Sequence, residues 1–138
     1  MKKCSSIDTD DLLFSLISGA VKEGKIKISG IVCPEDDRPA DSQREDIVIN
    51  TIALSHDKPQ DGTSNVNIYV ADKRVKIKGQ EQRAANRDRL QAIGDALISF
   101  LESVNLPDFE IWIESDIVLR DQAAGQHYRN LRIKWNIH

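Results

Sequence analysis

Two stretches of the chain carry the hydrophobic spacing of an amphipathic helix. Between residues 9 and 23, apolar side chains recur every three or four positions, and Gly24 follows as a stop signal. We expect Asp8 or Thr9 to cap this helix. A longer helix is predicted over residues 80–104, where "NLP" ends it because proline cannot continue a helix. The first turns of this second helix are almost wholly polar.

Other stretches alternate between apolar and polar residues, which is typical of strands with one buried face. The predicted strands cover residues 25–33, 46–54, 64–71, 109–119 and 127–138. The run 46–54 is apolar on both faces, which predicts a central strand. A shorter run around Val75 and Ile77 indicates at most an edge strand, whose lysines discourage unwanted pairing. Asp61 and Gly62 are expected to form a turn with positive φ.

The order of these elements predicts the fold class. Residues 34–46 contain two prolines and several acids but no apolar run, so we expect an exposed, mobile polar loop. The remaining order is α-β-β-β-α-β-β. It predicts one two-layer α+β domain over residues 1–138, with a largely antiparallel sheet and both helices packed on one face.

Composition and charge narrow the function. The net charge is −3 and the pI is about 5.6, which gives no global attraction to nucleic acid. Cys4 and Cys33 are the only cysteines and form no metal-binding pair, and a reducing cytoplasm is the default setting. Acidic residues interrupt the basic start before any signal-like apolar run forms, and no run reaches membrane-spanning length. We therefore expect a protein that is neither secreted nor bound to a membrane.

Searches for catalytic and metal-binding patterns find none. The chain has no phosphate loop, dinucleotide fingerprint, nucleophile elbow or His-Glu-x-x-His helix. The three histidines are not spaced as metal ligands, and the acids of the 34–46 loop lack calcium-loop spacing. Glu110, Glu114 and Asp116 would share one strand face if no bulge intervenes. From the sequence we expect no catalytic residue, no metal site and no cofactor.

One enzyme class matches the order of elements. The PD-(D/E)xK nucleases share the α-β-β-β-α-β order and place an Asp on the second strand and an acid-x-Lys pair on the third, around Mg²⁺. Asp46 begins the second predicted strand, but the third carries Asn65 and Asn67 in place of the charged pair. Neutral amides bind Mg²⁺ poorly. A nuclease, or a degenerate relative acting on DNA, is therefore the alternative interpretation.

Polar positions on exposed faces are the candidate contact residues. Asn65, Asn67 and Tyr69 share the strand face opposite Val66 and Ile68. Amides suit an interface because they hydrogen-bond without the desolvation cost of a charge. The candidate interface residues are Asp37, Arg38, Arg44, Asn65, Asn67, Tyr69 and Trp112.

Three segments carry a resemblance to a known family. At "REDIVINTIAL" (44–54), "GTSNVNIYVAD" (62–72) and "HYRNLRIKWNI" (127–137), the chain resembles tail-completion or head–tail connector (neck) proteins of tailed phages and prophage-like elements. The segment 73–82 departs from the compact spacing of that family.

The resemblance implies a non-enzymatic structural protein of the virion that assembles as a ring. It implies contacts with other head or tail proteins and at most non-specific contact with DNA in the ring lumen. The expected location is the bacterial cytoplasm during assembly and the virion afterwards. The loop 34–46 and the polar start of the second helix would be contact arms.

Overall fold

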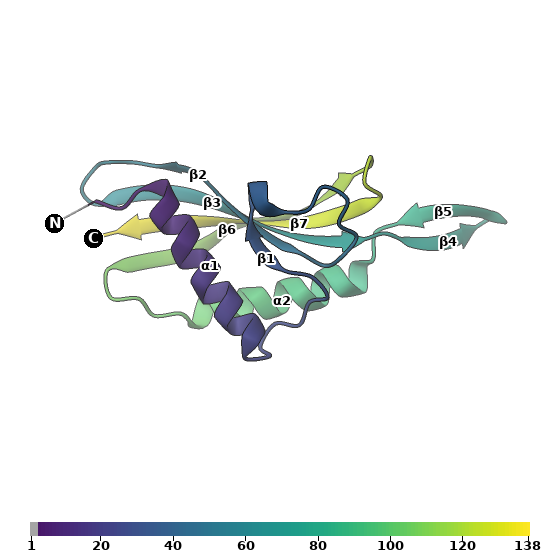
Figure 1. The fold of residues 1–138 in the computed structure, drawn as a ribbon, viewed down its shortest axis with the longest axis horizontal. Helices are drawn as coiled ribbons and strands as arrows, with labels where there is room; N and C mark the ends of the chain where they lie inside the picture. Colours follow the sequence, from purple (N-terminus) through teal and green to yellow (C-terminus); the bar gives the residue numbers. More distant parts are fainter. Residues whose placement is uncertain (1–2) are drawn as a thin grey trace.

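The described part of the chain, residues 3–138 of a computed structural model, contains two helices and seven strands (Figure 1). The helices are α1 (Ser6–Lys22) and α2 (Arg87–Ser103), and a short 3-10 helix, η1, covers Glu35–Asp37. The strands are β1 (Val32–Pro34), β2 (Ile47–Leu54), β3 (Gln60–Ala71), β4 (Lys73–Ile77), β5 (Gln80–Ala84), β6 (Phe109–Asp121) and β7 (Gln126–Ile137).

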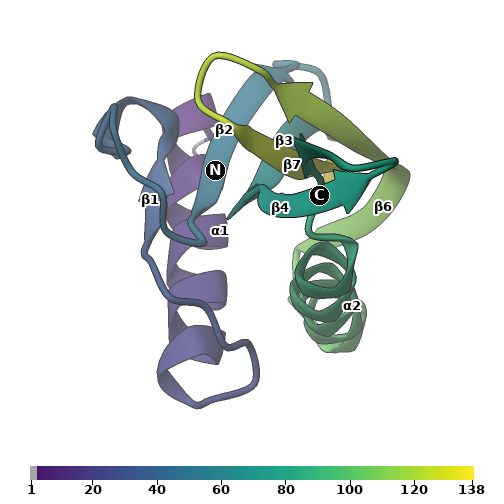
Figure 2. The same cartoon turned by 90° about the vertical axis from the view of Figure 1, so that its right-hand side faces the viewer.

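Five strands form the main sheet in the order β1-β2-β3-β7-β6. β2, β3, β7 and β6 pair antiparallel, whereas β1 runs parallel to β2. α1 lies along β1 and β2, and α2 packs under β3, β7 and β6 on the same face of the sheet (Figure 2). The predicted α+β class, with a largely antiparallel sheet and two helices on one face, is confirmed.

The core lies between the sheet and the two helices. Leu13 and Ile17 of α1 and Leu97 of α2 are fully buried, as expected from their helical spacing. They pack against Val66, Ile68, Leu131, Ile133 and Trp135, which alternate along β3 and β7. The period-2 pattern of the sequence therefore selected the buried face of both central strands correctly.

A chain of buried hydroxyl groups crosses this core. The indole Nε1 of Trp135 donates to Ser64 Oγ at 2.8 Å, and that hydroxyl lies 2.7 Å from Thr51 Oγ1. Thr51 in turn lies 2.8 Å from Thr9 Oγ1 and donates to Asp10 Oδ1 at 2.6 Å. This chain connects β7, β3, β2 and α1 and satisfies polar groups that would be costly if unpaired.

The first part of the chain corrects two expectations. α1 begins at Ser6, earlier than predicted, because Ser5 is the N-cap and forms a capping box with Asp8. Residues 25–31 are not a strand, and only Val32–Pro34 pairs with β2. Ile26 is still buried, so the apolar residue at this position packs into the core although the segment does not pair as a strand.

Residues 73–84 form a hairpin that replaces both the predicted edge strand and the polar helix start. β4 and β5 pair only with each other and project beyond the end of the main sheet (Figure 1). Lys78 and Gly79 have φ of 52° and 80°, the conformation of a tight two-residue hairpin turn. Helix α2 then starts at Arg87 behind Asn86, whose side chain accepts from the Arg89 N–H. The predicted helix start was wrong because polar residues fit a solvated hairpin equally well.

β6 contains a bulge that changes which side chains face the helices. Its register with β7 shifts between Ile113 and Ser115, so Glu114 is the extra residue. Asp116 consequently lies on the helix-facing side and binds Arg129, and it does not share a face with Glu110. Gly62 also differs from expectation, since it lies inside β3 opposite Leu54 and does not have positive φ.

Candidate functional site

Arg38 attaches the 34–46 loop to the sheet face opposite the helices, which we call the outer face. Its Nε donates to Asp46 Oδ2 at 2.9 Å, and a terminal nitrogen donates to Gln126 Oε1 at 3.1 Å. Its guanidinium lies 4.0 Å from the ring centroid of Tyr69, within cation–π range. Arg38 thus contacts the loop, β3 and β7 simultaneously, so this part of the loop is not exposed as expected.

Asp46 is the buried partner that makes this attachment specific. Its carboxylate accepts from the Ile31 N–H at 2.9 Å and from Ser42 Oγ at 2.6 Å, in addition to Arg38. Burial raises the pKa of Asp46, but the hydrogen bonds from Ser42, Ile31 and Arg38 outweigh it, so the pKa lies below its ordinary value. Gly30 is needed beside it, because a Cβ at that position would collide with the Asp46 carboxylate.

We expect the protein to lose stability in acid through three carboxylates. Hydrogen bonds from Arg89 and Arg129 lower the pKa of Glu45 and of Asp116, respectively. The pKa of Asp46 is also lowered, by its hydrogen bonds from Ser42, Ile31 and Arg38. A carboxylate whose pKa is lower in the folded than in the unfolded state stabilises the protein at pH values above its unfolded pKa of about 4. This contribution is lost as the pH falls through the pKa of the folded state. Urea unfolding at pH 6, 4 and 3 measures this, and an unchanged midpoint below pH 4 would contradict it.

The asparagines of the outer face form a short hydrogen-bonded row. Asn130 of β7 donates to Asn67 Oδ1 at 2.7 Å and to Asn65 Oδ1 at 3.2 Å, across the β3–β7 pair. Asn65 and Asn67 are half-buried, and Asn50 of β2 pairs in register with Asn65. The alternation of polar and apolar residues places Asn65, Asn67 and Asn130 on the right face, but Asn130 was not among the predicted contact residues.

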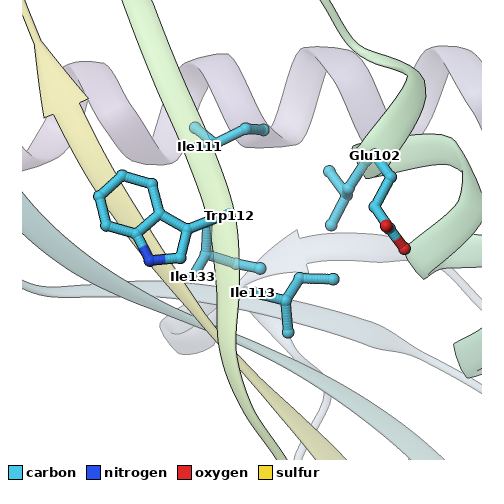
Figure 3. Close-up of a pocket in the computed structure, with 6 residues that line it drawn as sticks. Glu102, Ile111, Trp112, Ile113 and Ile133 are labelled. Atoms are coloured by element: carbon cyan, nitrogen blue, oxygen red, sulfur yellow. The ribbon is translucent and has the colours of Figure 1, made fainter.

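Tyr69 and Trp112 lie on the outer face but are separated. Tyr69 stacks on Tyr128 with 4.9 Å between ring centroids, beneath Arg38. Trp112 of β6 is 47% exposed and pairs in register with Lys134. Figure 3 shows its indole leaving β6 on the side opposite Ile113. The hollow in that view has a volume of about 20 Å³, which suits a water molecule and no larger ligand.

The seven candidate interface residues therefore do not form one cluster. Arg38 and Tyr69 are in contact, and Asn65 and Asn67 share a partner in Asn130. Asp37 lies in η1, and both it and Arg44 are exposed, whereas Arg38 is largely buried and has a structural contact. Arg38 thus has partners within the chain, and its role at an interface stays a prediction.

The surface of β6 was missed by the sequence reasoning. Residues 114–120 are all exposed, including the apolar side chains of Ile117, Val118 and Leu119. β6 is also the last strand in the sheet order, so within residues 3–138 its outer edge has no strand partner. The continuous apolar run "IVL" (117–119) predicts a buried strand by pattern, and only the sheet order reveals that it lies at an edge.

Asp46, the residue at the metal position in the nuclease interpretation, already accepts hydrogen bonds from Arg38, Ser42 and the Ile31 N–H. Its negative charge is therefore compensated by groups of the chain itself. Over residues 3–138, no group of three or more His, Cys, Asp or Glu side chains is arranged to hold a metal ion.

A hollow of about 440 Å³ lies at the opposite end of the sheet from Arg38. It is bordered by Gln60, Phe109 and Ile137, together with the segment around Pro59. None of the candidate residues lines it. In the described part of the chain, neither helix is long and apolar enough to cross a membrane.

The fold and outer face define a two-layer α+β protein whose main sheet ends in the three-residue β1 on one side and the long β6 on the other. Comparison with protein-family models and with curated proteins found no match to this chain.

Proposed function

We propose that the protein is a non-enzymatic structural component of a phage or prophage-like particle, of tail-completion or head–tail connector type, that assembles as a ring. The free edge of β6 carries this proposal. Natural proteins normally protect a long edge strand with charges, bulges or a covering element, because unpaired N–H and C=O groups recruit other chains. In β6 the bulge at Glu114 and the flanking charged residues protect the edge in part, but an apolar segment, residues 117–119, still lies exposed on it.

The size and chemistry of this surface favour a protein partner. Exposed apolar side chains gathered on one element mark interaction surfaces more often than scattered ones do. Trp112 on the same strand adds an aromatic residue of the kind enriched at interfaces. The outer-face asparagines offer neutral hydrogen-bonding groups beside it. The resemblance of the 44–54, 62–72 and 127–137 segments to neck proteins supplies the identity of the particle.

Light scattering coupled to size-exclusion chromatography tests the proposal. We expect a mass that is a fixed multiple of the 15.5 kDa chain, and closed rings in negative-stain images of the same fractions. If the chain assembles only on a partner, rings appear when portal or tail proteins encoded beside its gene are added. A protein that stays monomeric at high concentration, with and without those partners, would refute the proposed ring.

A further inference from the structure

The β4–β5 hairpin concentrates positive charge on a chain that is otherwise acidic. Residues 73–84 carry five basic side chains and one acidic one, a net charge of +4, whereas the whole chain has −3. The remainder therefore carries −7. The hairpin also projects away from the sheet and the helices (Figure 1). An exposed arm with charge opposite to that of its own body is suited to contact an acidic surface.

The cations of this hairpin are not neutralised within the molecule. Among the ion pairs of residues 3–138, none involves Lys73, Arg74, Lys76, Lys78 or Arg83. Arg74 and Arg83 lie directly opposite each other across the two strands. Like charges in that position destabilise a hairpin, so this arrangement does not serve the isolated arm.

The other face and the edges of the hairpin are also unoccupied. Val75 and Ile77 alternate with the basic residues and so lie on the opposite face, where Ile77 is exposed. Because β4 and β5 pair only with each other, each has one edge with unpaired backbone groups. A two-stranded hairpin is marginally stable by itself, and adding it to a larger sheet removes that weakness.

The free edge of β6 has the complementary properties. Glu110, Glu114, Asp116 and Asp121 outnumber Arg120, which gives the strand a formal net charge of −3. Asp116 and Glu114 pair with Arg129 and Lys134 of β7, whereas within residues 3–138 Glu110 and Asp121 have no lysine or arginine partner. Its exposed Ile117, Val118 and Leu119 match the apolar face of the hairpin, and its backbone edge lacks a strand partner. Charge, apolar surface and hydrogen-bonding edge therefore correspond between the two elements.

We propose that the β4–β5 hairpin of one copy adds as extra strands to the β6 edge of a second copy. This inference rests on the proposed ring and names the contact that builds it. The hairpin points away from its own sheet and pairs with no strand of it, so the partner edge must come from another molecule. The two surfaces differ, so the contact is head-to-tail, the type of interface that closes into rings. Strand addition supplies main-chain hydrogen bonds, and the charges fix the orientation.

Two exposed-site variants separate the halves of this contact. In the hairpin variant, Arg74→Glu with Lys76→Gln, the charge falls by three while the introduced carboxylate faces Arg83 across the strands, so the hairpin itself is retained. In the edge variant, Ile117→Lys with Leu119→Lys, lysines protect the β6 edge. The matched controls are Lys22→Glu with Lys27→Gln, and Ile7→Lys with Phe14→Lys, all at exposed positions on or near α1. Circular dichroism verifies that each variant is folded.

The decisive measurement is the mass of each variant alone and of their equimolar mixture. We expect each variant alone to be monomeric and both controls to assemble like the wild type. The mixture is expected to give a 1:1 dimer and nothing larger, because it contains one intact hairpin and one intact edge. Wild-type-like assembly of either variant would overturn the hairpin–edge contact while leaving the ring intact. A mixture that stays monomeric would overturn it as well.

Discussion

Arg38→Ala is expected to destabilise the folded monomer by about 3 kcal/mol, because removing one member of a buried ion pair leaves the other charge uncompensated. The side chains of Arg38 and Asp46 are only 14% and 2% exposed. The substitution also removes the hydrogen bond to Gln126 and the contact with the Tyr69 ring. Urea unfolding monitored by circular dichroism measures the change in the free energy of unfolding at neutral pH.

Arg44→Ala is the matched control, since Arg44 lies in the same loop but is exposed. We expect it to change stability by less than about 0.5 kcal/mol. The double variant Arg38→Ala with Asp46→Asn is expected to recover part of the loss, because it no longer buries an unpaired charge. If Arg38→Ala impaired only assembly and left the free energy of unfolding of the monomer unchanged, the structural role of Arg38 would be contradicted. Its prediction as an interface residue would then be supported.

Trp135→Ala is expected to cost about 3–5 kcal/mol, the usual range for truncating a large buried aromatic residue. Trp135 is fully buried and meets Phe109 edge-on, with 6.0 Å between ring centroids. Its loss would also remove the donor that begins the hydroxyl chain through Ser64 and Thr51. Thermal and urea unfolding of the variant, compared with wild type, give the free-energy change.

Trp135→Phe separates the packing contribution from the hydrogen bond. Phenylalanine keeps much of the ring volume but has no N–H, so Ser64 loses its indole donor. We expect a smaller loss of about 1–3 kcal/mol, the cost of disturbing a buried polar group. A loss as large as that of the alanine variant would contradict the packing account.

The fold was predictable where burial and periodicity agree. Leu13 and Ile17 lie on one helix stripe, and Val66 and Ile68 lie on one strand face, so the sequence places both elements correctly. Residues 80–84 show where this fails, since polar residues with no buried face carry no periodic signal. The hairpin instead depends on the backbone conformation of Lys78 and Gly79, which binary patterning does not encode.

For the candidate interface residues, the sequence predicts which face of a strand they lie on but not which residues they contact. Asn65, Asn67 and Tyr69 lie together because alternation along one strand fixes their direction. The contact of Arg38 with Gln126 joins residues far apart in the sequence, and its contact with Asp46 spans an irregular loop, so no periodic pattern indicates either of them. The bulge at Glu114 likewise exchanges the faces of all later residues in β6, so Asp116 could not be placed by counting from Glu110.

The unequal ends of the main sheet limit how it can aggregate. β1 has only three residues and ends in Pro34, which has no N–H to donate, whereas β6 has thirteen. Edge-to-edge growth of the main sheet requires a receptive edge at both of its ends. Direct pairing of one β6 with another would use the long edge of both molecules and stop at two copies. The main sheet alone therefore allows a dimer, and any larger assembly through strand pairing must also use the edges of the β4–β5 hairpin.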